Sequence, residues 1–201
     1  GSRPDALALP AVVAQRTGGN GVVVNGPDAG TIQNNVMAFA ARNGLAIRGA
    51  ANSWTVTGNE FRGNAIAAGT NEGMSLEAAN TINTTVTGNL SVSNGGPGFD
   101  LPASTGPNTY RNNTATGNGV FNAATAETPG FRVQGSNQLL DRNVSTANFG
   151  AGILVVGAAQ SNRLTRNAIF ANGTITNLGA AAATAQIGID LLATADNQAR
   201  G

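Results

Sequence analysis

Gly44-Leu45-Ala46-Ile47 is one copy of a pattern that recurs along the chain: a Gly, an apolar residue, any residue and a second apolar residue. Within one copy the two apolar residues lie two positions apart, so they point to the same face of a strand. The pattern occurs seven times, in copies that begin with Gly21, Gly44, Gly73, Gly98, Gly130, Gly152 and Gly188. Such a repeat indicates short stacked strands with one continuous core, and it says little about function.

An Asn lies between each copy and the next. In a corner between strands, an Asn carboxamide can donate to the coil on one side and accept from the coil on the other, and it tolerates left-handed backbone angles. We therefore expect these six residues to form a structural ladder: Asn35, Asn59, Asn89, Asn113, Asn143 and Asn167. Five of them are followed five residues later by a second Asn: Asn64, Asn94, Asn118, Asn148 and Asn172.

The ladder spacing alternates between 24 and 30 residues, so the larger repeating unit is a pair of coils. The extra length of the long coil falls mostly in the connections 65–72, 119–129 and 173–187. Loops on one face of a solenoid are the usual place for binding. Glu72 and Glu127 are the only charged residues of these connections. We therefore interpret the loops as spacers rather than as a chemical site.

The composition favours short strands over helices and argues against several partners. Only 10% of the residues are charged and 4% are aromatic, which suits strands with many turns. The net charge is +1 and like charges form no run, so we expect no nucleic-acid partner. No apolar run is long enough for membrane insertion. The absence of His and Cys removes the usual ligands of zinc, copper and iron.

The combination of Gly-Φ-x-Φ with Asn-x4-Asn, where Φ is apolar, resembles the repeat of right-handed parallel β-helices, as in pectin-lyase-like proteins and Asn-rich bacterial surface proteins. The resemblance implies an all-β, right-handed parallel β-helix solenoid with about seven coils over residues 21–201. Residues 1–20 are then a tag remnant and an N-terminal cap or incomplete first coil. The resemblance also implies a secreted or cell-surface bacterial protein, but it is specific for fold and not for activity.

The resemblance implies which catalytic side chains an enzyme of this fold would carry. Lyases use Arg or Lys with carboxylates that hold calcium, hydrolases use two or three clustered carboxylates, and epimerases use a His-containing motif. The chain has no Lys and no His, which excludes Lys-based lyases and the epimerase pattern. Calcium stays open as a cofactor, because Asp, Asn and carbonyl oxygens suit it, although no Asp-rich loop is present.

The carboxylates on the outward column do not form a catalytic pair. Asp100 and Asp190 lie three coils apart, or about 14 Å, whereas paired glycosidase carboxylates require about 5 to 9.5 Å. Asp100 neighbours Arg132 on the next coil, and Arg48 likewise neighbours Glu77. We interpret both as surface ion pairs worth about 0.2–1 kcal/mol each. The sequence thus predicts no catalytic, cofactor-binding or metal-ligating residue.

Four residues are candidates for binding: Trp54, Asp100, Arg132 and Asp190. Trp54 is the only Trp and could offer an aromatic platform to a glycan. Tyr110 falls in an inward column and is expected in the core. Apolar residues in or beside outward columns of the last coils suggest a missing continuation, a cap or self-association through the C-terminal end: Leu154, Val156, Leu191 and Leu192.

The sequence favours a structural or adhesive module that performs no chemistry, with polysaccharide or another surface protein as its partner. A carbohydrate-active β-helix is the first alternative, either a polysaccharide lyase, a glycoside hydrolase or a glycan-binding domain. A phage-type spike is the second.

Overall fold

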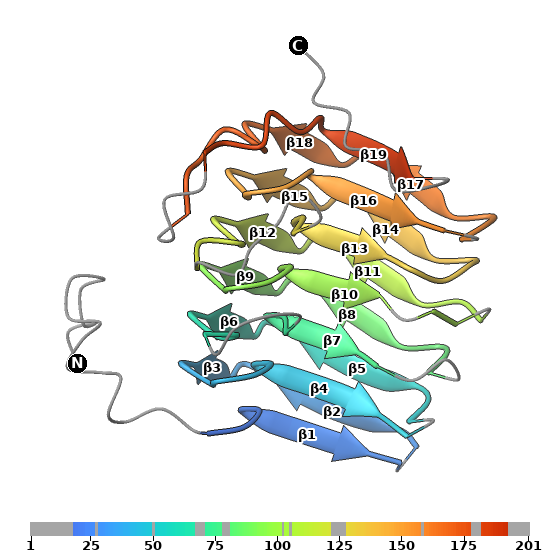
Figure 1. Ribbon diagram of the computed structural model, residues 1–201. Coiled ribbons are helices and arrows are strands. Elements are labelled where there is room, and N and C mark those ends of the chain that lie inside the picture. Colours follow the sequence, from blue (N-terminus) through green and yellow to red (C-terminus); the bar gives the residue numbers. More distant parts are fainter. Residues whose placement is uncertain are drawn as a thin grey trace.

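The computed structural model describes residues 18–26, 28–49, 51–66, 71–77, 81–101, 103–104, 106–121, 128–157, 159–177 and 182–192. Their regular structure consists of short strands, which stack as successive coils from β1 to β19 (Figure 1). The part of the chain so described contains no helix long and apolar enough to cross a membrane. The predicted N-terminal segment of residues 1–20 lies outside the described residues except for Gly18 to Asn20.

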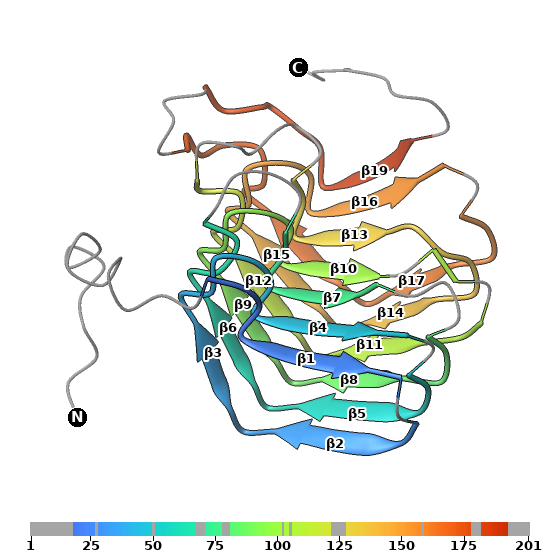
Figure 2. The ribbon, with the colours of Figure 1, turned by 60° about the horizontal axis from the view of Figure 1, so that its bottom comes forward.

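The strands form three parallel sheets, here named A, B and C, which enclose one core (Figure 2). Sheet A contains β1 (Val22–Asn25), β4 (Leu45–Arg48), β7 (Met74–Leu76), β10 (Phe99–Leu101), β13 (Phe131–Val133), β16 (Ile153–Val156) and β19 (Ile189–Leu192). Sheet B contains β2 (Gly30–Gln33), β5 (Trp54–Thr57), β8 (Thr85–Thr87), β11 (Thr109–Arg111), β14 (Leu139–Asp141) and β17 (Arg163–Thr165). Sheet C contains β3 (Val36–Ala38), β6 (Glu60–Arg62), β9 (Leu90–Val92), β12 (Thr114–Thr116), β15 (Val144–Thr146) and β18 (Ala168–Phe170).

The Gly-Φ-x-Φ copies are the strands of sheet A, and their register aligns equivalent positions from coil to coil. Leu45 pairs with Met74, which pairs with Phe99. Inside the helix, the ring of Phe99 stacks on that of Phe131 at 4.9 Å between centroids and meets Phe61 edge-on at 6.2 Å. The all-β parallel helix expected from the repeat is therefore confirmed, with strands too short to bury a face alone.

A single left-handed residue makes each corner between sheets B and C. The residue immediately before every ladder Asn has φ between 54° and 64°: Asn34, Gly58, Gly88, Asn112, Arg142 and Arg166. One residue in this conformation turns the chain sharply enough for the next strand to begin two positions later. Arg142 and Arg166 adopt this left-handed conformation although it costs free energy for a residue other than Gly. The geometry of the corner therefore outweighs the backbone preference of the residue.

The ladder amides are hydrogen-bonded from coil to coil. Asn35 Nδ2 donates to Asn59 Oδ1 at 3.1 Å, and each following ladder Asn repeats this bond at 2.9–3.1 Å as far as Asn167. Asn113 Nδ2 also donates to the Val86 carbonyl at 2.9 Å. A second ladder runs from Asn64 to Asn172 with bonds of 2.8–3.1 Å. The two columns together fix the register of the stack.

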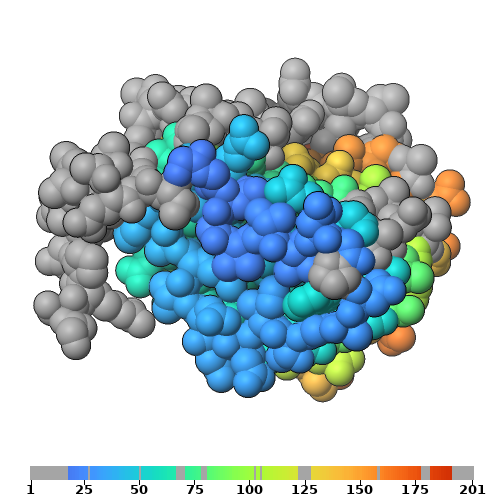
Figure 3. Space-filling model, turned by 90° about the horizontal axis from the view of Figure 1, so that it is seen from below, coloured from blue at the N-terminus to red at the C-terminus, as the bar shows by residue number. Residues whose placement is uncertain are grey.

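Exposed apolar side chains mark both ends of the helix, not only the C-terminal end. Leu191 in the last coil is 71% exposed, and Val36 in the first coil is 65% exposed. Figure 3 looks at the first coil, in blue, which forms one end of the stack. The expectation that Leu154 belongs to an exposed patch is wrong, since it is only 2% exposed. Its register neighbours Arg132 and Asp190 stand on either side of it on the same face.

Replacing Asn113 by Ala tests the ladder. The substitution removes the carboxamide oxygen that accepts from the Asn89 backbone N–H and side chain, and the Nδ2 group that donates to the Val86 carbonyl and to Asn143. We expect the free energy of unfolding to fall by about 1–3 kcal/mol, measured by urea denaturation. The matched control is Asn35→Ala at the exposed start of the same column, which should cost clearly less. Equal losses at the two positions would contradict a ladder held by buried amides.

Candidate functional site

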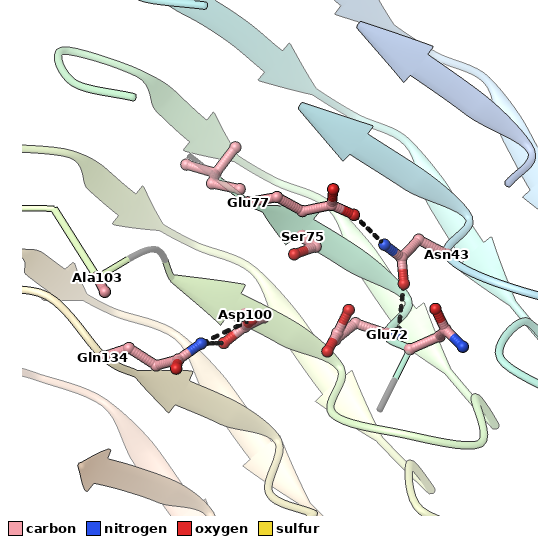
Figure 4. A pocket seen from close by; sticks show the side chains of 9 residues that line it. Asn43, Glu72, Ser75, Glu77, Asp100, Ala103 and Gln134 are labelled. Atoms are coloured by element: carbon pink, nitrogen blue, oxygen red, sulfur yellow. Dashed lines mark hydrogen bonds between the residues drawn. The ribbon is translucent and has the colours of Figure 1, made fainter. Parts of the chain in front are cut away.

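A pocket of about 330 Å³ opens on the outer face of sheet A, among residues of β7 and β10 and of the connections next to β4, β7, β10 and β13 (Figure 4). It is predominantly polar, and three of its side chains carry carboxyl groups. The lining residues are Asn43, Asn71, Glu72, Ser75, Leu76, Glu77, Asp100, Ala103 and Gln134. The helix builds this pocket from residues far apart in sequence because the parallel register brings their strands side by side.

The carboxylate of Asp100 accepts hydrogen bonds from two side chains beside the pocket. Arg132 Nε donates to its Oδ1 at 2.8 Å and Arg132 Nη2 to its Oδ2 at 2.9 Å. Gln134 Nε2 lies 2.8 and 2.9 Å from the same two oxygens. The side chain of Asp100 is 7% exposed and that of Arg132 is 22% exposed. The interpretation of this contact as a surface ion pair is therefore wrong: the pair is largely buried, and the outward column is covered here.

Glu72 brings a second carboxyl group to the same guanidinium. Its Oε1 accepts a hydrogen bond from Arg132 Nη2 at 2.8 Å, and its side chain is 5% exposed. Its position is fixed by Asn43, whose Oδ1 accepts from the Glu72 backbone N–H at 2.7 Å. Asn43 Nδ2 in turn donates to Glu77 Oε1 at 2.7 Å. The side-chain amide of Asn43 thus holds the end of the connection between β6 and β7 beside the pocket.

Sharing one guanidinium between two carboxyl groups shapes the charge of the site. Burial raises the pKa of Glu72 to about 9; the negative charges of Asp100 and Glu77 act in the same direction, while Arg132 opposes them. Burial disfavours the charge of Arg132, but its hydrogen bonds and ion pairs with Asp100 and Glu72 raise its pKa overall. Arg132 thus bridges Asp100 and Glu72, and the raised pKa of Glu72 keeps a proton on it at neutral pH.

The four candidate binding residues do not gather in one place. Asp100 lines the pocket and Arg132 holds it there. Asp190 lies two strands beyond Arg132, with Leu154 between them. Trp54 lies on sheet B and is half-buried; its ring occupies the space that a side chain would need on Gly30, its partner in register. Tyr110 is fully buried in the core, as its inward column indicates.

Sequence reasoning missed the contributions of Asn43, Glu72, Ser75 and Gln134. Ser75 stands in the outward column beside Asp100, so the register alone could have placed it. Glu72 ends a connection that we interpreted as a spacer, and for this residue that interpretation is wrong. Its place directly before Gly73 of the strand was the available signal. Glu127, the other charge in these connections, lies outside the described residues.

A second buried carboxylate on sheet B has a different environment. Arg166 donates to both oxygens of Asp141 at 2.8 Å, and Arg111 lies 3.0 Å away. Burial works to raise the pKa of Asp141, but hydrogen bonding and charge from Arg166, and the charges of Arg111 and Arg142, lower it overall. Asp141 is thus a link between three coils. Among the described residues, no three His, Cys, Asp or Glu side chains are arranged to hold a metal ion.

Comparisons with known proteins agree with the architecture. A family model described as "Right handed beta helix region" matches residues 12–175. Among solved structures, that of the pectate lyase Pel9A is similar with a TM-score of 0.60 and 17% sequence identity. The match covers 88% of this chain and 50% of that one, so the chain spans about half the length of the lyase. A search of curated proteins finds no match. At this identity the likeness concerns the fold alone.

The pH dependence of stability tests the protonation of Glu72. The folded-state pKa of about 9 lies above the ordinary value of 4.5 for a Glu side chain, so the native state keeps a proton that the unfolded chain releases. The free energy of unfolding should therefore fall as pH rises from 6 to about 9, by at most about 1.4 kcal/mol per pH unit. Because the chain has no His or Cys, little else titrates in this window.

Glu72→Gln should flatten that slope in urea denaturation across the same pH range. Glu60→Gln is the matched control, because Glu60 pairs with Arg62 on sheet C, away from the pocket, and its replacement should leave the slope unchanged. A wild-type stability that does not vary between pH 6 and 9 would contradict a protonated Glu72.

Proposed function

Because this chain belongs to the right-handed β-helix family, we propose that it is a non-catalytic, adhesive module of a secreted or cell-surface bacterial protein, and that it binds saccharide in the sheet A pocket. The observation that carries the proposal is the pocket itself. Its polar side chains come from neighbouring coils and point into one space (Figure 4). A volume of about 330 Å³ lies at the small end of the range of about 300–1,000 Å³ for small-molecule sites.

The hydrogen bonds around the pocket support ligand binding because they hold its walls in place without a ligand. Arg132 and Gln134 lock the carboxylate of Asp100, and Asn43 ties Glu72 to Glu77. Side chains fixed in this way lose little conformational entropy when a ligand arrives. A rigid solenoid that presents such a pocket suits attachment to a glycan.

The same bonds favour binding over catalysis. A carboxylate that acts as nucleophile or base needs a lone pair directed at the substrate. Both oxygens of Asp100 already face donors on Arg132 and Gln134. Glu72 is available for proton transfer in the pocket, but Asp100 has no free carboxylate oxygen with which to act as its catalytic partner.

Glycoside hydrolysis is the second candidate, and one observation favours it. Glu72 and Asp100 both accept from Arg132 Nη2, at 2.8 and 2.9 Å, which keeps the two carboxyl groups close together. The raised pKa of Glu72 keeps a proton on it, as a general acid requires, and Asp100 lies beside it in an ion pair with Arg132. Reducing-end release from neutral and uronate polysaccharides, with and without calcium, decides between the two functions. Turnover that Glu72→Gln abolishes would replace the binding proposal with this one.

Blocking the pocket without touching its charges tests the binding proposal. Ala103 is exposed at the pocket, so Ala103→Leu adds bulk there and removes no hydrogen bond of the charged group. Wild type should bind one or more members of an immobilised panel of neutral and uronate glycans, and the variant should bind them at least about tenfold more weakly. Ala168→Leu on sheet C is the matched control, since Ala168 is exposed and away from the pocket, and it should bind as wild type does. Equal binding by both variants, or none by wild type, would contradict a saccharide site in this pocket.

A further inference from the structure

Some polar atoms of the pocket already have hydrogen-bond partners within the protein, and others do not. Both oxygens of Asp100 accept hydrogen bonds, as does Glu77 Oε1. The amide of Asn43 both donates and accepts. A ligand therefore gains little from these groups, and its contacts depend on the atoms that remain.

Three lining atoms have no hydrogen-bond partner anywhere in the described part of the chain: Glu72 Oε2, Ser75 Oγ and Gln134 Oε1. Glu72 and Ser75 are both almost fully buried, at 4% and 1% exposed, yet both line the pocket. Glu72 Oε2 and Ser75 Oγ stay accessible from the cavity, so a ligand in the pocket can supply the hydrogen-bond partners that the protein does not. In Figure 4 the carboxyl end of Glu72 is directed toward the space beside Ser75 and Asp100.

The charge of the lining limits which ligand can supply these bonds. Three lining residues carry carboxyl groups, and no Arg is among the lining residues. Arg132 is engaged with Asp100 and Glu72, and Arg48 lies 3.7 Å from Glu77. A carboxylate on the ligand would enter beside these groups without a basic side chain to meet it, which costs binding energy in a partly buried site.

On the premise that the pocket binds saccharide, we propose that its ligand is a neutral, hydroxyl-rich sugar rather than a uronate, and that Glu72 and Ser75 contact it directly. Sugar hydroxyls both donate and accept, so they match a carboxyl group, a serine hydroxyl and an amide oxygen together. The volume accommodates about one or two sugar rings at the low end of ligand-site sizes. The specificity then rests on acceptors for hydroxyl groups and on the lack of a basic lining side chain to pair with a carboxylate.

Matched ligands that differ at one carbon test the inference. Galactose and galacturonate oligomers of equal length carry CH2OH or COO⁻ at C6, and glucose and glucuronate form a second pair. Calorimetric titration at pH 7 and low salt should show at least about tenfold tighter binding of the neutral member in one pair. Ser75→Ala should weaken that binding about tenfold, because it removes one hydrogen-bonding group from the site. Ser161→Ala, on the exposed connection before β17, is the matched control and should bind as wild type does.

The outcomes separate this inference from the proposed function. Equal or tighter binding of the uronate, with or without added calcium, would overturn the neutral-ligand inference and leave saccharide binding in place. Neutral binding that Ser75→Ala leaves unchanged, in a variant as stable as wild type, would remove Ser75 as a contact and overturn the assignment. If no neutral or acidic saccharide of the panel binds, the proposed function itself fails.

Discussion

Hydrogen bonding between successive coils holds this protein together. Strands of three or four residues cannot bury a face alone, so each coil is stable only when it is paired with its neighbours. The two Asn ladders add side-chain bonds to the backbone bonds at the corners, where strand pairing stops. Because a slip of one residue would break every amide pair at once, the ladders hold the stack in a single register.

That register makes the pocket possible. Ser75, Asp100 and Arg132 lie far apart in sequence, yet they occupy one outward column of adjacent strands. Each of these side chains stands about 4.8 Å from the next, the spacing of paired strands. Arg132 can therefore reach Asp100 on the coil before it and Glu72 at the edge of the coil before that. The position of the site is thus a consequence of strand pairing, and its chemistry depends on which residues occupy the column.

The repeat predicts the fold and part of the site for a physical reason. Inward columns and ladder positions are constrained in every coil, so Leu45 and Asn113 could be assigned from spacing alone. The same alignment predicts that Asp100 and Arg132 are neighbours on adjacent strands. It does not predict that they are buried, because the exposure of an outward residue depends on what covers the sheet. Alignment places Glu72 directly before Gly73, but its contact with Arg132 two coils away does not follow from alignment, since Glu72 stands outside the paired strands at the end of a connection whose length varies.

The pocket lies where the sequence departs most from its own repeat. The residue directly before the Gly of each sheet A strand is charged only in Glu72, and elsewhere it is Asn, Pro, Ala or Ile. The outward column is apolar at Val23, Ala46 and Leu154 and polar from Ser75 to Arg132. A fold that needs the same side chains in every coil would not place a buried cation and two carboxyl groups in only one part of the stack, since such a group is costly to desolvate. A buried charged group alone does not mark a ligand site, since Asp141 is equally buried on sheet B, but Arg132 and its partners adjoin a pocket, which supports the proposed site.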